Sequence, residues 1–375
     1  MRIALVIPTL NGGGAERVMS TMANYWESTD HEVILITHDS EKKDFYPLSP
    51  GVTRYGFDIS KPPRHIGDTI KHNIQRVTLP RKVIQTCHPD IVISFTNRTS
   101  IQTLAGLSGT EIPVIVSERN NPVAQPLPLP WEMLRRTLYP KASAVVVQTP
   151  SVKEWALRFL AEDRVSVIPN PLSPPSMQEI PPELPSRLNG KKIVAAMGRL
   201  HHFKGFDILL QAFSAVARKR SNWALMILGD GDERFRLEQM ALQLGIQDRV
   251  FLAGRVHNPT DYLRASDIFV LSSRHEGFPN ALIEAMASGL PSIAADCPFG
   301  PGDIISNGID GILVKNEDIH ELSRAIDHLM GNDHIRKSMG SMAKQSSTRY
   351  NIDTIMAQWE DIIARVIHRY PIPEA

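Results

Sequence analysis

The sequence is poor in cysteine and has no long hydrophobic run. Its 375 residues contain two cysteines, Cys87 and Cys297, which lie far apart without a CxxC or Cys/His spacing. This spacing argues against a zinc site or a redox pair, and both thiols are expected among apolar side chains. No stretch approaches the roughly 18 uninterrupted apolar residues of a membrane span, so a transmembrane protein is not expected.

An excess of charge of one sign is also missing. The chain has 41 basic and 40 acidic residues and a formal net charge of +1. This balance gives no global attraction for nucleic acid, and we expect no nucleic-acid partner. The opening MRIALVIP carries one charge and a short apolar run that ends at a proline, which favours a first strand over a signal peptide. We therefore expect a cytoplasmic protein.

What the sequence does contain is a regular alternation of short apolar runs and amphipathic segments. This alternation is typical of α/β domains in which helices cover a parallel sheet, and the chain is too long for one ordinary core. We therefore predict two Rossmann-like, doubly wound domains. The predicted strands are 2–8, 32–37, 91–95, 113–117, 144–147 and 165–168 in the first half, and 193–197, 224–228, 249–252, 268–271, 292–295 and 311–314 in the second.

A proline-rich segment separates the two halves. Residues 169–185 read PNPLSPPSMQEIPPELP, and prolines at this density exclude a helix or a central strand. The predicted parts are an N-terminal domain (1–170), a linker (171–190), a C-terminal domain (191–350) and a last segment (351–375) with the option of packing back on the first domain. Helices are expected at 318–330 and 352–368. Ligands of such sheets bind at the carboxyl ends of the strands, so the site is expected in the cleft between the domains.

The stretch HEGFPNALIEAMASGLP, residues 275–291, predicts a helix over 279–288 that begins without a capping side chain. Pro279 suits the first helical position, but Gly277 and Phe278 offer no side-chain acceptor where Ser, Thr, Asp or Asn would stand. Either water or an anionic ligand must satisfy the first free N–H groups.

Two cations are expected near this helix. Arg199 directly follows the strand 193–197, and Lys204 is predicted to open the next helix. A solvated basic turn is one interpretation. Beside an uncapped helix, however, the forked guanidinium of Arg199 and the compact charge of Lys204 form a good diphosphate clamp.

The first turn, NGGGAER at residues 11–17, is also rich in glycine. Its three glycines permit close approach of a ligand, and the helix after it has no obvious capping side chain. The dinucleotide pattern GxGxxG fails at Arg17, which argues against NAD binding, although Asp39 after the second strand keeps that alternative open. A tight turn without a ligand is the other alternative.

Carboxylates form the third group of candidates. Glu276 precedes the helix 279–288 and Glu284 lies within it. Such a pair suits either acid/base hydrolysis of glycosides or hydrogen bonding to ribose and sugar hydroxyls, and the second fits better beside a phosphate. Asp230-Gly231-Asp232 matches a metal-binding DxD, but we interpret Asp232 as the N-cap of the next helix and predict no metal.

Together these motifs resemble glycosyltransferase family 4, the retaining nucleotide-sugar transferases of GT-B fold. The resemblance covers essentially the whole chain. Its most specific parts are E-x7-E, here Glu276 to Glu284, and G-R-L with K-G, here from Gly198 to Gly205. It implies two Rossmann-like domains that face each other across a cleft, a nucleotide-sugar donor and no further cofactor.

The resemblance also implies roles for single residues. Arg199 and Lys204 would neutralise the donor diphosphate, Glu284 would hold the ribose and Glu276 the transferred sugar. The implied donor-binding residues are Gly13, Gly14, Arg199, Lys204, Arg255, Val256, Glu276, Gly277, Phe278, Asn280, Ala281 and Glu284, with backbone amides acting at Asn280 and Ala281. The predicted catalytic residues are Arg199, Lys204 and Glu276, which the resemblance implies, together with Glu118.

The chain departs from the family pattern at two places. Many members carry a histidine after the strand that ends here at Ser117, whereas this chain has Glu118-Arg119-Asn120, and we expect Glu118 to contact sugar or acceptor instead. The glycine-rich turn that usually ends in Glu is here Phe299-Gly300-Pro301-Gly302-Asp303.

The first domain is expected to hold the acceptor. Residues 61–82 and 131–141 are basic and amphipathic, so they suit either ordinary core-facing helices or docking on anionic lipid at the inner face of the plasma membrane. The predicted function is transfer of a hexose or N-acetylhexosamine from a nucleotide sugar, expected to be UDP-linked. The acceptor would be a glycan or a polyprenyl- or lipid-linked glycan.

Two alternatives remain. An NAD-dependent nucleotide-sugar epimerase or oxidoreductase is disfavoured by Arg17 and by the lack of a Tyr-x-x-x-Lys pair. A glycan-binding protein without catalysis is disfavoured because the cations and carboxylates for a donor are all present.

Overall fold

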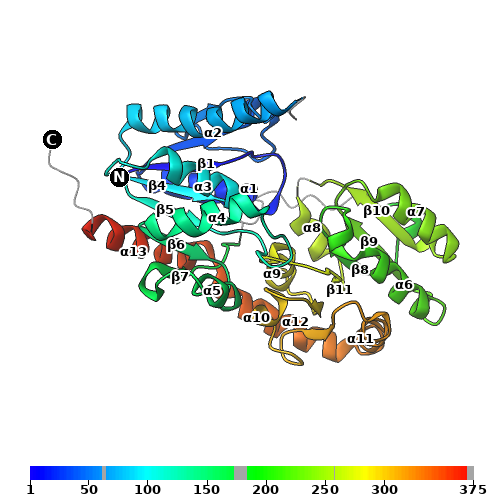
Figure 1. Cartoon of the computed structure of the whole chain (residues 1–375). Helices are drawn as coiled ribbons and strands as arrows, with labels where there is room; N and C mark the ends of the chain where they lie inside the picture. Colours follow the sequence, from blue (N-terminus) through cyan, green and yellow to red (C-terminus); the bar gives the residue numbers. More distant parts are fainter. Residues whose placement is uncertain (61–64, 173–183, 257, 370–375) are drawn as a thin grey trace. The chain divides into compact units, whose positions relative to one another are not determined.

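The computed structural model describes residues 1–60, 65–172, 184–256 and 258–369. The chain forms two compact units (Figure 1). The first consists of Met1–Ser173 together with Ile352–Ala375, and the second of Pro174–Asn351. Most of the predicted linker, residues 173–183, lies outside the described residues.

The first unit is built on a seven-stranded parallel sheet in the order β3-β2-β1-β4-β5-β6-β7. The strands are β1 (Arg2–Ile7), β2 (Glu32–Thr37), β3 (Thr53–Gly56), β4 (Ile91–Phe95), β5 (Val114–Ser117), β6 (Ala144–Val147) and β7 (Val165–Val167). The helices are α1 (Gly14–Ser28), α2 (Ile66–Cys87), α3 (Asn97–Gly106), α4 (Leu129–Leu138), α5 (Pro150–Ala156) and α13 (Ile352–Arg369).

The last helix, α13, belongs to the core of the first unit. Its Trp359 is fully buried, and the ring lies edge-on to that of Trp26 with centroids 6.4 Å apart. Phe95 at the end of β4 lies 6.3 Å from the same indole. The chain therefore returns from the second unit to complete the core of the first.

The second unit has a six-stranded parallel sheet in the order β10-β9-β8-β11-β12-β13. The strands are β8 (Lys192–Met197), β9 (Trp223–Leu228), β10 (Val250–Gly254), β11 (Ile268–Leu271), β12 (Ser292–Asp296) and β13 (Ile312–Lys315). The helices are α6 (Phe206–Ala217), α7 (Arg234–Gln243), α8 (Pro259–Arg264), α9 (Asn280–Ala287), α10 (Pro301–Ile304), α11 (Ile319–Gly331) and α12 (Asp333–Ser347).

The two doubly wound parallel sheets confirm the predicted α/β fold. All the predicted strands are present with ends within two residues, because runs of Val, Ile and Leu are buried on both faces of a parallel sheet. Two elements were not predicted. Strand β3 is a short, partly polar edge strand, and α12 has few large apolar residues.

The candidate residues lie just after the carboxyl ends of the strands. In the second sheet, Arg199 follows β8, Asp230 follows β9 and Arg255 follows β10. The loop from Ser272 to Pro279 joins β11 to α9. In the first sheet, the glycine-rich turn follows β1 and Glu118 follows β5. This edge is where open α/β sheets bind ligands.

Candidate active site

Helix α9 begins without a capping side chain, as the sequence predicts. It starts at Asn280, one residue later than expected, because Pro279 has a ψ of 82° outside the helical range and is the N-cap. The first turn contains no acidic residue. Asn280 N–H donates to Phe278 O, whereas Ala281 N–H has no acceptor among the described residues. The positive end of this helix is therefore not neutralised by its own side chains.

Lys204 and Glu276 meet directly beside this loop. Lys204 Nζ donates to Glu276 Oε1 at 2.6 Å, and Ser273 Oγ donates to the same oxygen at 2.6 Å. Glu276 is buried, while the Lys204 side chain is one-quarter exposed. The structure thus joins a cation and a carboxylate that are 72 residues apart in the sequence.

Lys204 is not the first residue of a helix, which corrects the sequence prediction. It ends the 3₁₀ turn His202–Lys204, and α6 begins two residues later at Phe206. Gly205 between them has a φ of +61°, and a Cβ at this position would overlap Ser272 O. Only glycine fits this close approach, and it brings the backbone of Lys204 against the end of β11.

Arg199 is paired with Asp232 in the structure. Its side chain is largely exposed, with Nη2 3.8 Å from Asp232 Oδ2, which is also exposed. An exposed pair at this distance holds neither partner firmly.

The prediction that Asp232 caps α7 is wrong. Glu233 is the N-cap residue and makes no side-chain cap. Glu233 N–H donates to Leu200 O, so the turn continues against Leu200 for one residue more than expected. Among the residues that the structure describes, no group of three or more His, Cys, Asp or Glu side chains could hold a metal ion.

The remaining donor-site candidates of the second unit lie around the same edge. Glu284 is buried in α9, four residues after Asn280 and on the same helix face. Arg255 is exposed and Val256 half-buried directly after β10. Gly277 is half-buried, whereas the Phe278 ring is buried against Tyr350 with centroids 5.8 Å apart. Phe278 can therefore contact a ligand only through its backbone.

The turn from Phe299 to Gly302 packs against the start of α9. A Cβ at Gly300 would lie 2.9 Å from Pro279 Cδ and 3.6 Å from Glu276 Cβ, and Gly300 has a φ of +139°. The sequence indicated this turn only as a departure from the family pattern. In the structure, this turn lies directly over the residues that begin α9.

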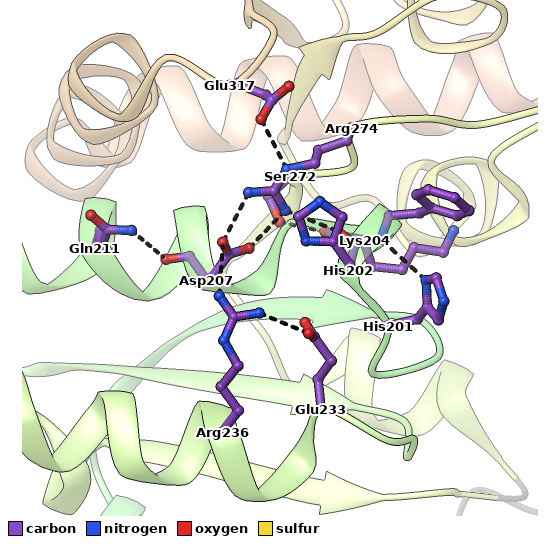
Figure 2. Close-up of polar contacts among 11 residues, drawn as sticks. His201, His202, Lys204, Asp207, Gln211, Glu233, Arg236, Ser272, Arg274 and Glu317 are labelled. Carbon is purple, nitrogen blue, oxygen red and sulfur yellow. Dashed lines mark hydrogen bonds and ion pairs between the residues drawn. The ribbon is translucent and has the colours of Figure 1, made fainter. Parts of the chain in front are cut away.

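An ion network centred on the buried Arg274–Asp207 pair joins the Lys204 turn to the Glu276 loop, and sequence reasoning missed it. Figure 2 shows Arg274 between Asp207 and Glu317. The Arg274 guanidinium donates to both carboxylate oxygens of Asp207 at 2.8 Å, to Glu317 Oε2 at 2.9 Å and to His202 O at 2.9 Å. The hydrogen bond with Asp207 raises the pKa of Arg274. The network ties the turn that carries Lys204 to the loop that carries Glu276.

The glycine-rich turn of the first unit differs from the sequence expectation. Gly13 is the N-cap of α1 and has no side chain to cap the helix, and Gly14 is the first helical residue. The carboxylate of Glu16, however, lies over Gly13, where a Cβ would overlap it. Burial raises the pKa of Glu16, although its own backbone N–H acts in the opposite direction. This helix start therefore already has an acidic partner.

The side chain of Glu118 is buried against Tyr139 and Arg135. Its side chain has no exposed surface, accepts from Tyr139 Oη at 3.1 Å and lies 3.6 Å from Arg135 Nη1. Burial raises the pKa of Glu118, and Arg135 counteracts this effect. The predicted contact with sugar or acceptor is therefore not supported, because the end of β5 turns this side chain toward α4 and the residues that follow it.

Comparisons with known proteins agree with this geometry. Residues 12–174 match the family model described as Glycosyltransferase Family 4, and residues 179–346 match that described as Glycosyl transferases group 1. A Campylobacter jejuni protein is 31% identical over 371 residues, which is 98% of this chain and 99% of that protein. It is named GalNAc-alpha-(1->4)-GalNAc-alpha-(1->3)-diNAcBac-PP-undecaprenol alpha-1,4-N-acetyl-D-galactosaminyltransferase. The chain belongs to glycosyltransferase family 4.

Solved structures show the same fold for this glycosyltransferase. Sucrose-phosphate synthase from Thermosynechococcus elongatus matches with a TM-score of 0.82 and 18% identity, over 98% of this chain and 99% of that chain. Anabaena HepE in complex with UDP matches with a TM-score of 0.79 and 18% identity, over 97% and 100%. These structures confirm the GT-B fold class, and the Campylobacter jejuni relative confirms the glycosyltransferase function. Nothing in these comparisons favours an NAD-dependent enzyme or a non-catalytic glycan-binding protein.

Proposed function

We propose that this glycosyltransferase moves a hexose or N-acetylhexosamine from a UDP-sugar to a glycan or lipid-linked glycan, with retention of configuration and without a metal ion. The product would belong to surface polysaccharide, lipopolysaccharide or glycoprotein glycan synthesis. The observation that carries the proposal is the Lys204–Glu276 ion pair beside a helix start that has no acidic residue in its first turn.

We assign the donor diphosphate to the start of α9 because its negative charge would balance Lys204 and the positive end of the helix. Lys204, Arg199 and the amide of Ala281 would stabilise the negative charge that grows on the leaving phosphate. Glu276 would exchange its bond with Lys204 for one with a sugar hydroxyl. Glu284 would accept from the ribose, and backbone groups at Gly277, Phe278, Asn280, Arg255 and Val256 would complete the site.

Retention is assigned to attack on the same face of the sugar. The bond from C1 to the phosphate oxygen breaks, the bond from C1 to the acceptor oxygen forms, and the acceptor proton passes to the departing phosphate oxygen. No protein nucleophile is needed. Proton NMR of the first product formed tests this step, because an inverted anomeric configuration would contradict it.

The lipid-linked acceptor is supported by one relative and by surface chemistry. The name of the Campylobacter jejuni relative includes an undecaprenol-linked acceptor. The described parts of the two basic amphipathic segments form α2 and α4 of the first unit. We propose that the basic side chains of these helices bring the enzyme to an anionic membrane surface. No helix of the described residues is long and apolar enough to cross a bilayer.

One experiment tests the proposed donor chemistry. The protein is incubated with a panel of UDP- and GDP-sugars, while release of the nucleotide and thermal stabilisation are measured with and without EDTA. Stabilisation and turnover with a UDP-sugar that persist in EDTA are expected. Activity that is lost in EDTA and restored by manganese would contradict metal independence, and the absence of stabilisation by every sugar nucleotide would contradict the donor site.

A further inference from the structure

Three helices of the first unit enclose an apolar groove of about 470 Å³. They are α2, α3 and α4 (Figure 1). The groove is lined mainly by Ile70, Ile74, Val77, Ile101, Trp131 and Leu134. Ile70 and Ile74 are each more than half exposed. Single exposed apolar residues need no explanation, but a hollow lined by them on three helices is typical of a binding site.

Two arginines stand on the helices that line this groove, outside its apolar lining. Arg98 is the second residue of α3, directly after the carboxyl end of β4, and its guanidinium lies 5.4 Å from the centroid of the Trp131 ring. Arg76 is half-buried on α2, where burial and the positive charge of Arg98 lower its pKa. Arg76 Nη2 donates to Ile59 O at 3.2 Å. Neither arginine has a carboxylate partner among the described residues.

A buried histidine adjoins the same cations. His38 follows β2 and is almost fully buried, and its Nε2 has no hydrogen-bond partner among the residues that the structure describes. Burial and the charge of Arg76 lower the pKa of His38 to about 4. His38 is therefore neutral near pH 7 and adds no charge beside Arg76.

We propose that the groove holds the first isoprenoid segment of a polyprenyl diphosphate, the lipid anchor of the acceptor, and that Arg76 and Arg98 bind its diphosphate. This rests on the lipid-linked acceptor of the proposed function and adds where the anchor is held. The charged end of the groove lies at the carboxyl edge of the sheet, where an acceptor glycan must arrive. The hydrocarbon then runs between α2 and α4.

A hollow between three helices fits a single lipid chain, which can enter it, better than the flat surface of a bilayer. A diphosphate is also the anion that two adjacent guanidinium groups can share.

Farnesyl diphosphate is the probe for this site. Binding of farnesyl diphosphate, farnesol and inorganic diphosphate is followed through intrinsic tryptophan fluorescence and by calorimetry. Farnesyl diphosphate is expected to bind at least about tenfold more tightly than either fragment, and Arg98→Gln or Ile74→Ser to weaken it by about tenfold. The controls are Lys82→Gln, an exposed cation farther along α2, and Phe235→Ser, an exposed apolar residue of the second unit, for which no change is expected.

Three results would overturn the inference. One is equal affinity for diphosphate alone or farnesol alone. The second is loss of binding to anionic vesicles without polyprenyl phosphate in the Ile74→Ser variant, which would make the groove a bilayer contact. The third is a dimer that loses farnesyl diphosphate binding as it forms, which would make the groove an interface between two copies.

A failure of the proposed function can be distinguished from a failure of this inference. Thermal stabilisation by UDP-sugars is measured on the same samples. A protein that binds farnesyl diphosphate but no sugar nucleotide contradicts only the proposed function. A protein that is stabilised by a UDP-sugar but does not prefer farnesyl diphosphate contradicts only the acceptor site.

Discussion

Helices α1 and α9 begin alike in sequence but differ in charge. Both follow a residue that gives no side-chain cap, Gly13 for α1 and Pro279 for α9. In α1 the third residue is Glu16, whose carboxylate lies back over Gly13. In α9 the third residue is Leu282, and no acid occupies the first turn. The missing N-cap therefore does not by itself indicate an anion site, because a carboxylate one turn inside the helix can supply the charge.

The start of α6 gives a third arrangement. Its first turn contains Asp207, but that carboxylate is paired with Arg274. Of these three starts, only α9 combines an open positive end with a nearby cation in Lys204. This contrast is the reason for placing the diphosphate at α9.

The largest effect is expected from Arg274→Met. The substitution leaves the buried Asp207 carboxylate without its bidentate partner, and we expect the free energy of unfolding to fall by about 3 kcal/mol. Urea unfolding measures the loss. Arg324→Met, an exposed arginine of the same unit, is the control and should change stability by less than about 0.5 kcal/mol. Equal losses in both variants would mean that the network does not hold the Lys204 turn.

Lys204→Ala removes the cation beside the open start of α9. By analogy with the loss of one preorganised oxyanion donor, kcat should fall on the order of a hundredfold. Initial rates of nucleotide release from a saturating UDP-sugar and acceptor measure this effect. Lys337→Ala, also in the second unit and exposed, should keep the full rate. A near-normal rate for Lys204→Ala would refute the diphosphate clamp.

Asn280→Asp makes the start of α9 resemble that of α1. The change alters charge with little change in shape, so the helix should gain about 0.3 to 1 kcal/mol in stability while the Kd for the UDP-sugar rises about tenfold. Calorimetry and urea unfolding measure the two quantities. Tighter or unchanged donor binding in the acidic variant would show that the diphosphate lies elsewhere.

Glu16→Gln is expected to have the smallest effect. The pKa of Glu16 is raised in the folded state, so the folded protein binds this proton more tightly than the unfolded chain. The stability of the natural protein relative to the Gln variant should therefore fall as the pH rises through the pKa of Glu16. Urea unfolding of both proteins from pH 4 to pH 7 measures the difference. If the free energy of unfolding of the natural protein instead rises with pH relative to that of the Gln variant, the expected direction is wrong. If the Kd for the UDP-sugar changes by more than about twofold, the start of α1 also affects donor binding, which contradicts the contrast with α9.

The strands and the outline of the donor loop could be predicted from the sequence because their signals are local. Apolar runs identify strands buried on both faces, and Pro279 after Gly277-Phe278 identifies a helix start without a cap. Strand β3 was not predicted because its residues, Thr53-Arg54-Tyr55-Gly56, contain no apolar run.

Contacts between residues that are far apart in the sequence could not be predicted from such local signals. Asp207 and Arg274 are 67 residues apart, and nothing near either residue indicates the other. Glu118 follows a strand, as a ligand contact should, but only the packing of Arg135 and Tyr139 around it shows that it turns inward. Asp232 was misassigned because a turn against the backbone of Leu200 delays the next helix by one residue.

The return of α13 to the first unit separates the order of synthesis from the order of folding. The second unit is one continuous segment and can close as soon as its own residues have left the ribosome. The first unit, although made first, waits for Trp359 before the pocket around Trp26 and Phe95 is filled. During translation it is thus the older half of the enzyme that remains unfinished.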